Sequence, residues 1–372
     1  MGVYKLVALL DMDSYFASIE CAKNPALRSR PIAVIGIGEK TVITSANYLA
    51  RSYGIKTGMN IKEAKKLCPK IIFLKADFPY YELTTLKIAQ IIEKYFPVYR
   101  EASIDEFYIA LDNVDFPIRR LELLKDEIYE KLSLKCTIGV GCNPHIAKTA
   151  CEVSKPDGFL VVDDVDLFSK SVDISKVLGI GKSSKHVLEE FGVQTLWEFL
   201  HSKDCGMFDT LKMSILKTYT ESEFFRTELP KSMGHILTLD RSINSFDEII
   251  EIGKYLLFGL YVKLVRYKMG TKSISVYLKL SNGSFFSTSK SIGNFCNDYI
   301  LISKIMEQMY RTLYLSGSVV KIGISLQHLK YLGGFQSSLF WEDELRKFEK
   351  IAQLNDIHLG GFYTLRNKKV VG

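Results

Sequence analysis

This chain of 372 residues lacks the features that mark secreted, membrane-spanning or metal-thiolate proteins. Its seven cysteines are odd in number, scattered and without a Cys-x-x-Cys pair, so we expect reduced thiols and no structural zinc. No apolar run approaches the roughly 18 residues that a membrane span needs. The start of the chain, Met1–Leu10, does not have the layout of a signal peptide. These absences predict a cytoplasmic protein with no membrane partner.

The composition that remains is that of a folded chain with more than one domain. Hydrophobic residues make up 47% and charged residues 24% of the sequence, which is typical of globular proteins. The length predicts two to four domains. A formal net charge of +7 favours a polyanionic partner, although it is too small to establish one.

Three carboxylates stand at the ends of strand-like segments. Asp11 closes an apolar run, and Asp105-Glu106 interrupts two strand candidates at residues 97–101 and 107–111. Carboxylates without neighbouring His or Cys are hard ligands suited to Mg²⁺, and two ions about 3.5–4 Å apart would activate a hydroxyl and stabilise a phosphate leaving group. Alternatively, each acid only ends a strand at the surface. Adjacent residues of a flat strand face opposite sides, so both acids reach one site only if the chain bends there.

Hydrophobic periodicity in the first 160 residues predicts a βαββαβ core with an insertion of about 65 residues after its first strand. The elements expected are strand 3–10, a helix after the capping residues Asp13-Ser14, strands 31–36 and 41–44, helices 45–51, 61–67, 80–95 and 118–132, strand 136–140 and helix 144–153. The turn Lys155–Gly158 follows, and it places Lys155 at the mouth of this core. A solvated turn lysine is the alternative.

Two glycines next mark a helix junction. Gly179 and Gly181, followed by Lys182, lie between helical patterns, where glycine lets backbone N–H groups approach a phosphate. The pattern predicts a helix-hairpin-helix that binds DNA backbone without reading sequence. A glycine-capped helix junction with no ligand is the alternative.

A second βαββαβ pattern occupies residues 234–327. Its elements are strand 234–240, helix 246–268, strands 272–280 and 284–289, helix 295–315 and strand 319–327, and Ser281–Ser284 is a hairpin signal. From Gly234 to Lys330 there are 12 Lys and Arg against 6 Asp and Glu, a net of +6. One face of the strand 272–280 carries serine, tyrosine and lysine, which suits salt-sensitive phosphate binding. A merely solvated face is the alternative.

The motifs of the chain resemble those of the Y-family translesion DNA polymerases, in particular the DNA polymerase IV branch. The matching segments are Asp11–Ala17, Ala46–Arg51 with Gly54 and Gly58, Ser103–Glu106, Ala147-Lys148, Lys155–Gly158 and Leu178–Gly181. The resemblance runs from about residue 4 to residue 340. It implies an α+β right-hand polymerase with a ferredoxin-like βαββαβ palm.

The resemblance also implies a division into domains. The palm would comprise residues 1–14 and 80–165, with small fingers at 15–79 between them. A thumb with the helix-hairpin-helix would follow at 166–230, then a linker at 231–241. A βαββαβ little finger at 242–332 would bind DNA, and the tail would occupy 333–372.

The resemblance assigns roles to the residues of the first domain. Asp11, Asp105 and Glu106 would be catalytic and would hold two Mg²⁺ ions, for which Mn²⁺ could substitute, with the Met12 carbonyl as a further metal ligand. Residues that would bind the incoming nucleotide are Tyr15, Phe16, Tyr48, Arg51 and Lys155. The Phe16 ring would be the steric gate against a 2′-hydroxyl. Ser14 departs from the aromatic residue or Cys of many relatives.

Near the C-terminus, Gln336, Leu339 and Phe340 resemble the pentapeptide that binds the bacterial sliding clamp of the β type. Ser337 departs from the Leu often found second in that motif. A Gln followed by two apolar residues can dock in a groove of a partner, or the apolar pair packs on its own domain.

These features together predict template-directed nucleotidyl transfer to a primer 3′-hydroxyl by a monomer that uses primer–template DNA and deoxynucleoside triphosphates. We expect no proofreading exonuclease, because no separate Asp-x-Glu cluster is present, and therefore low fidelity and damage tolerance. One rival is another two-metal enzyme on a similar core, such as a nucleotide cyclase. The other is a non-catalytic DNA-binding scaffold. Neither rival accounts for all of the motifs.

Overall fold

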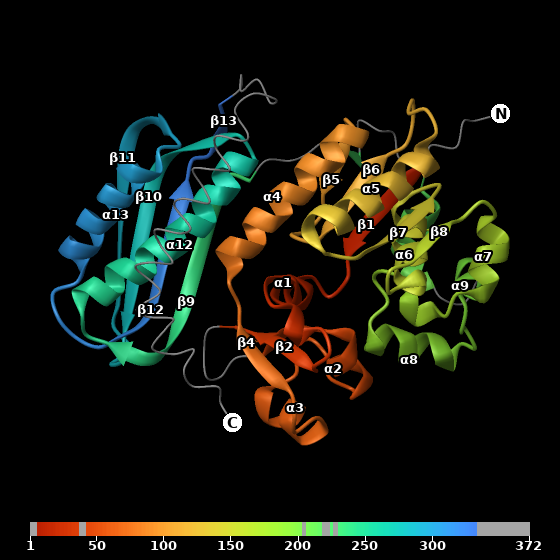
Figure 1. Cartoon of the computed structure of the whole chain (residues 1–372), viewed down its shortest axis with the longest axis horizontal. Coiled ribbons are helices and arrows are strands. Elements are labelled where there is room, and N and C mark those ends of the chain that lie inside the picture. Colours follow the sequence, from red (N-terminus) through yellow and green to blue (C-terminus); the bar gives the residue numbers. More distant parts are fainter. Residues whose placement is uncertain (1–5, 37–41, 203–205, 218–223, 226–229, 333–372) are drawn as a thin grey trace. The chain divides into compact units, whose positions relative to one another are not determined.

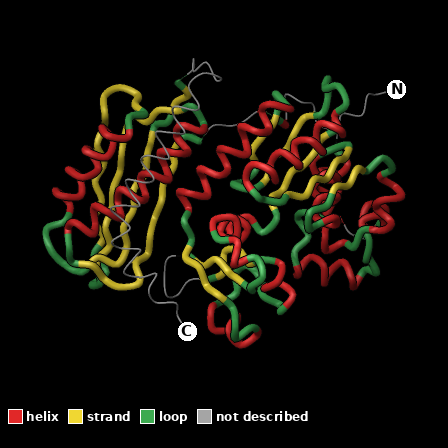
Figure 2. Tube along the Cα trace, in the orientation of Figure 1, coloured by secondary structure: helices red, strands yellow, loops and turns green. Residues whose placement is uncertain are grey.

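The computed structural model describes residues 6–36, 42–202, 206–217, 224–225 and 230–332. The chain divides into two compact units, one of Met1–Pro25 with Lys87–Thr227 and the other of Ala26–Leu86 with Glu228–Gly372. Helices and strands alternate in both units (Figures 1 and 2), which is the α+β class expected. The division into palm, fingers, thumb, linker, little finger and tail given above remains a prediction.

The first unit is built on a five-stranded sheet of order β5-β6-β1-β7-β8. Its strands are β1 (Val7–Met12), β5 (Tyr99–Glu101), β6 (Glu106–Ala110), β7 (Cys136–Gly141) and β8 (Phe159–Val161). β1 lies between β6 and β7 and is antiparallel to both, so all six of its residues are buried. The all-apolar strand pattern therefore predicted a central strand correctly, whereas β8 was not predicted.

Helices accompany this sheet and continue beyond it. They are α1 (Tyr15–Lys23), α4 (Phe78–Tyr95, divided between the units), α5 (Pro117–Leu132), α6 (Pro144–Ser154), α7 (Val165–Ser171), α8 (Lys182–Glu190), α9 (Leu196–His201) and α10 (Asp209–Leu216). Short 3₁₀ turns cover Pro25–Leu27, Ile174–Lys176 and Gly206–Phe208. Ile174, Val177, Leu188, Val193, Leu196 and Phe199 form the core that joins the helices after α6.

The start of α1 differs from the expectation. Asp13-Ser14 was predicted to cap this helix, but Ser14 has a left-handed backbone (φ 48°) and its side chain makes no capping hydrogen bond. The Asp13 carboxylate instead accepts hydrogen bonds from Thr137 and from the backbone N–H of Asp157. A tertiary contact has therefore displaced the local cap that the residue types favour.

Two glycines of β7 set the distance between α6 and the sheet. A Cβ atom added to Gly139 would lie 2.2 Å from the Ala147 carbonyl oxygen and 2.2 Å from the Cys151 nitrogen. A Cβ on Gly141 would lie 2.6 Å from the Ile146 side chain. Only glycine lets the backbone of α6 approach this closely.

We expect Gly139→Ala to destabilise the protein by about 3 kcal/mol or more, because the added methyl group meets backbone atoms that cannot rotate away. Denaturant unfolding followed by circular dichroism would measure the loss. Gly206→Ala is the matched control, since the nearest atom to its added Cβ is an Asp209 oxygen at 3.7 Å. Equal stability of the two variants would contradict this account of the α6 packing.

The second unit contains two sheets. The smaller has the order β3-β2-β4, formed by β2 (Ile32–Ile35), β3 (Ile43–Ala46) and β4 (Ile72–Lys75), and carries helices α2 (Tyr48–Ser52) and α3 (Ile61–Leu67). The helix predicted from residue 45 begins later, because Ser45 and Ala46 pair with β2 and Asn47 caps the helix by accepting from the Ala50 N–H. β4 was not predicted.

The larger sheet has the order β11-β10-β12-β9, and β13 (Lys330–Tyr331) pairs with β10. Its elements are β9 (Ser232–Ile243), α12 (Phe246–Arg266), β10 (Met269–Leu280), β11 (Phe285–Cys296), α13 (Tyr299–Leu313) and β12 (Val319–Gln327). Helices α12 and α13 share one hydrophobic core with this sheet. The second βαββαβ pattern is thus confirmed.

Most of the segment expected as a linker, residues 231–241, lies in a strand, and its place in the domain division remains a prediction. Ser232–Ile243 forms an edge strand that pairs with β12 from Ser232↔Gln327 to Ile243↔Val319. The strand pattern at residues 234–240 was the better guide, because sheet pairing satisfies backbone groups that a solvated linker would leave to water.

Candidate active site

Sheet pairing brings the three carboxylates together. Asp11 at the end of β1 lies directly opposite Glu106, the first residue of β6. One residue further, the Met12 N–H donates to the Asp105 carbonyl oxygen at 2.9 Å. The chain bends at residues 103–105, as the sequence required if both neighbouring acids were to serve one site. The prediction that Asp11 meets Asp105 and Glu106 is therefore confirmed.

Burial makes this group of acids electrostatically unfavourable. Asp11 is only 6% exposed, and burial raises its pKa to about 7, with Glu106 and Asp105 contributing and Lys155 opposing. Burial also raises the pKa of Asp105, and the charge of Glu106 adds to this rise while a hydrogen bond from Ser103 opposes it. The site thus concentrates negative charge that a cation would stabilise.

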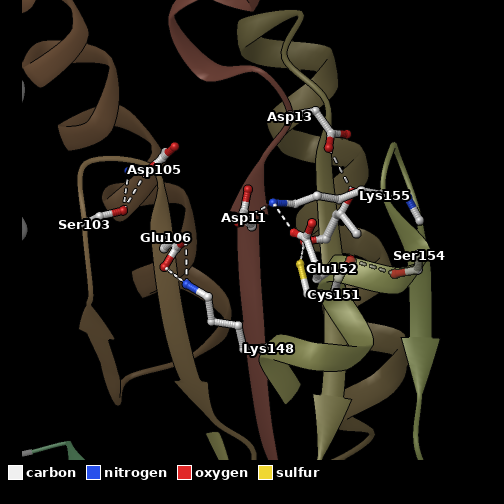
Figure 3. A network of polar contacts seen from close by, with 12 residues as sticks. Asp11, Asp13, Ser103, Asp105, Glu106, Lys148, Cys151, Glu152, Ser154 and Lys155 are labelled. Carbon is white, nitrogen blue, oxygen red and sulfur yellow. Dashed lines mark hydrogen bonds and ion pairs between the residues drawn. The ribbon is translucent and has the colours of Figure 1, made fainter. Parts of the chain in front are cut away.

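Two lysines from α6 and the turn after it balance this charge (Figure 3). Lys155 Nζ lies 2.8 Å from Asp11 Oδ2. Lys148 Nζ lies 2.8 and 2.7 Å from the two oxygens of Glu106. Ser103 Oγ donates to Asp105 Oδ1 at 2.5 Å. Each of the three acids therefore has a partner within the protein.

The donor set fits a hard divalent cation, although its side chains are turned to these partners. Within the residues that the structure describes, no three His, Cys, Asp or Glu side chains are arranged as a metal-binding group. The backbones of Asp11, Asp105 and Glu106 are nevertheless adjacent and their carboxylates repel one another. Oxygen donors of this kind are what Mg²⁺ or Mn²⁺ takes, once the side chains release the lysines and Ser103.

Asp13 is a site residue that the sequence analysis missed. Its carboxylate is 4% exposed and accepts from Thr137 Oγ1 at 3.0 Å and from the Asp157 N–H at 2.7 Å. It thereby holds the turn that carries Lys155 against the sheet. The signal in the sequence was the Asp-x-Asp spacing at a strand end, which was interpreted only as a helix cap.

The first turn of α1 carries the predicted gate. The rings of Tyr15 and Phe16 are 5.7 Å apart at a tilt of 43°. Tyr15 is 3% exposed, whereas Phe16 is half-buried. Both residues belong to the same unit as Asp11 and Lys155, and their assignment to the nucleotide remains a prediction.

Tyr48 and Arg51 belong to the second unit and form a pair on α2. The Arg51 guanidinium lies 4.9 Å from the centre of the Tyr48 ring, and its Nε donates to the Ala46 carbonyl oxygen. The shared helix face expected from the i, i+3 spacing is confirmed. The contact of these side chains with a triphosphate remains a prediction.

The glycine junction predicted as a helix-hairpin-helix lies directly before α8. Gly179 has φ 93°, a conformation that favours glycine, and Gly181 begins α8 without a capping side chain. Ile180 between them is buried in the core of these helices, and Lys182 is exposed. The role of Gly179, Gly181 and Lys182 in binding DNA backbone remains a prediction.

Several lysines on the strands of the larger sheet have no acidic partner within the part of the chain that the structure describes. Ion pairs in this part of the chain involve glutamates on helices, and their basic partners are Arg241, Lys254, Lys263, Arg266 and Arg311. Strand lysines with no ion pair among the described residues are Lys272, Lys279, Lys290, Lys321 and Lys330. Lys279 and Lys321 are even direct cross-strand neighbours, an arrangement of like charges that costs stability and suits an anionic partner.

Gln336, Leu339 and Phe340, which are predicted to bind a sliding clamp, lie outside the described part of the chain. Among the described residues, no helix is both long and apolar enough to cross a membrane.

Comparison with known proteins identifies the family of this chain. The model of the impB/mucB/samB family matches residues 10–152, and that of the C-terminal domain of the same family matches residues 230–339. DNA polymerase IV of Ureaplasma parvum is 29% identical over 354 residues, which cover 91% of this chain and 98% of the relative. DNA polymerase IV of Saccharolobus solfataricus is 28% identical over 333 residues, covering 83% and 94%.

Solved structures agree as well. The insertion ternary complex of Dbh DNA polymerase matches with a TM-score of 0.58 and 26% identity, covering 87% of this chain and 98% of that one. The crystal structure of DinB from Sulfolobus solfataricus matches with a TM-score of 0.57 over the same shares. The chain belongs to the Y family of DNA polymerases, in the group similar to DNA polymerase IV. It is a DNA-directed DNA polymerase of the translesion type, and membership of this family implies dependence on divalent metal ions.

Proposed function

We propose that this polymerase extends a primer by Mg²⁺-dependent nucleotidyl transfer at Asp11, Asp105 and Glu106, with Mn²⁺ as a possible substitute. The observation that carries the proposal is the register Asp11↔Glu106 with Asp105 beside Met12. The ions would activate the primer hydroxyl and stabilise charge on the transferred phosphate. The Met12 carbonyl would add a backbone oxygen ligand.

The other residues would bind and orient the substrates. Lys155, Tyr48 and Arg51 would hold the triphosphate, with Arg51 as a fork-shaped donor. Tyr15 and Phe16 would line the sugar, and the Phe16 ring would exclude a 2′-hydroxyl. Catalysis would then rest on positioning and on charge stabilisation, without a covalent enzyme intermediate.

DNA would be held by backbone contacts in two places. The thumb, residues 166–230, would offer Gly179, Gly181 and Lys182 to one part of the phosphate backbone. The little finger would offer the strand lysines that form no ion pair among the described residues, which are Lys272, Lys279, Lys290, Lys321 and Lys330. Such contacts position a duplex without reading its sequence, which suits an enzyme that must accept damaged templates.

Replacing both lysines in Lys279→Gln/Lys321→Gln should weaken binding of primer–template DNA and reduce the slope of log affinity against log salt by about 2, because about 0.9 counterion is released per phosphate contact. Fluorescence anisotropy across a salt series would measure this. Lys254→Gln, which removes a lysine facing Glu307 on the helices, should leave the slope unchanged. An unaltered slope in the double variant would remove these lysines from the interface.

We further propose that the enzyme is a cytoplasmic monomer without proofreading, of low fidelity, that serves damage tolerance with a bacterial sliding clamp of the β type. Gln336, Leu339 and Phe340 would bind the clamp. Stimulation of extension by that clamp, lost in Leu339→Ala/Phe340→Ala, would support this part of the proposal. Equal primer extension with and without the clamp would refute this part of the proposal.

The experiment that tests the whole proposal is primer extension with Mg²⁺ on undamaged and lesion-bearing templates. We expect template-dependent addition on both, without strong 3′→5′ degradation. Product formation that needs no primer–template would favour a cyclase-like enzyme. Absence of incorporation in a single turnover, with DNA still bound, would favour a non-catalytic scaffold.

A further inference from the structure

Lys148 forms an ion pair with Glu106, and the function proposed above gives this pair no role. Its ammonium group lies 2.8 Å from Glu106 Oε1 and 2.7 Å from Oε2, so one cation holds both oxygens of the acid (Figure 3). The side chains of Lys148 and Glu106 are 24% and 20% exposed. A pair this well shielded is held more firmly than a surface ion pair.

Backbone packing, and not the reach of a flexible side chain, places Lys148 at this point. Its neighbour Ala147 is fully buried, and Cys151, one turn further along α6, donates from Sγ to the Thr137 carbonyl oxygen. Gly139 and Gly141 let this part of the helix lie directly on β7. The same helix ends at Lys155, whose ammonium faces Asp11. Helix α6 and the residue that caps its C-terminus therefore bring two cations to two carboxylates of the site.

The two lysines differ in what else they could bind. Under the proposed function Lys155 also binds the triphosphate, so it has a second anionic partner besides Asp11. Lys148 faces both oxygens of Glu106, and within the described residues it makes no other hydrogen bond or ion pair. Its charge is therefore directed at one metal ligand alone.

We propose that Lys148 is a positioning residue that fixes the orientation of Glu106 and acts as a resident counter-cation of the metal site, in competition with divalent ions. The inference rests on the proposed function, since it takes Glu106 as a metal ligand. While the acids lack a metal, the ammonium group offsets their repulsion. A divalent cation held by Glu106 would have to replace the Lys148 ammonium at the same carboxylate oxygens, so the two cations would compete for this acid.

This role predicts opposite changes in two measurable quantities. Removing the ammonium leaves more negative charge around the acids, so a divalent cation should bind more tightly. It also releases Glu106 from its fixed orientation, so the rate of transfer should fall, because partners that orient metal ligands typically contribute about 10–100-fold. Simple structural damage would instead weaken metal binding and lower the rate together.

The test compares Lys148→Met and Lys148→Arg with the wild-type protein. Binding of Mn²⁺ to the protein alone would be measured by electron paramagnetic resonance, and kcat and KM for the nucleotide by primer extension. In Lys148→Met we expect Mn²⁺ binding about tenfold tighter and kcat at least about tenfold lower, with KM changed by less than about threefold. Lys148→Arg, which keeps the charge, should restore most of the wild-type behaviour.

Lys170→Met is the matched control, because Lys170 forms an exposed pair with Asp166 on α7 and should change neither quantity. Unchanged or weaker Mn²⁺ binding in Lys148→Met would overturn the inference, as would a Lys148→Arg variant no closer to wild type than Lys148→Met. If Lys148→Met does not give a folded protein by circular dichroism, Lys148→Gln takes its place with the same expected changes. If the wild-type protein binds no Mn²⁺ and extends no primer, the proposed function itself is refuted. This outcome differs from those that overturn only the inference on Lys148.

Discussion

Asp105→Ala should reduce primer extension on the order of 10³-fold or more while binding of primer–template DNA survives. Asp105 lies beside Met12 at the end of the central strand pair, where its carboxylate adds to the charge around Asp11. A metal site that loses one of three acids loses several kcal/mol of stabilisation of the transition state, and each 1.36 kcal/mol is a factor of ten in rate. Single-turnover incorporation with DNA in excess would measure the rate.

Asp115→Asn is the control for this experiment. Asp115 is an exposed acid on the loop that follows β6, so its loss changes the net charge without touching the site. We expect wild-type extension in this variant, and fluorescence anisotropy should show similar DNA affinity for both variants and for the wild type. A wild-type rate in Asp105→Ala would show that Asp105 is not a metal ligand.

Phe16→Ala should admit ribonucleotides, lowering the preference for deoxynucleotides on the order of 100-fold. The half-buried Phe16 ring stands in the first turn of α1, directly after the strand that ends in Asp11 and Met12. If that ring fills the space of a 2′-hydroxyl, its removal abolishes a steric clash, and differences of one small group in a closed pocket are worth about 10–200-fold. The ratio of kcat/KM for paired deoxy- and ribonucleotides measures the preference.

Phe116→Ala controls for the loss of a phenylalanine ring. Phe116 is 82% exposed at the start of α5, and its removal should leave sugar discrimination unchanged. Should Phe16→Ala discriminate as well as the wild type, the gate must be formed by another residue. Extension with deoxynucleotides should persist in both variants, which keeps the comparison informative.

Much of the fold could be predicted where one local signal dominates. The run Leu6–Leu10 has no polar face and therefore predicted a strand buried on both sides. Helix α3 was predicted at its observed bounds, 61–67, and β12 at 319–327, because turn residues delimit a clear periodicity. Short elements were missed, as β4 and β8 illustrate. Their residues become strands by pairing with partners distant in sequence, which no local pattern reveals.

The three carboxylates that lie together could be predicted from the sequence, but the side chains that they pair with could not. Asp11, Asp105 and Glu106 could be chosen from strand ends, residue types and the resemblance to the Y family. Their present partners, Lys155, Ser103 and Lys148, could not be chosen in the same way. Lys155 is 144 positions from Asp11, and Lys148 is 42 positions from Glu106, so these ion pairs depend on how α6 lies on the sheet.

The sequence by itself determined the identity of the acids, the two βαββαβ patterns and the excess of positive charge in the second of them, because each is written in residue types and in spacings of a few positions. The tertiary structure decided which acid faces which lysine, that Asp13 holds the Lys155 turn instead of capping α1, and that β9 extends over residues 232–243, beyond the strand predicted at 234–240. The reason is that side-chain periodicity shows which face of one helix or strand is buried. A contact between two side chains also depends on which elements pack together and on the distance between them. Here Gly139 and Gly141 set that separation by letting α6 lie against β7.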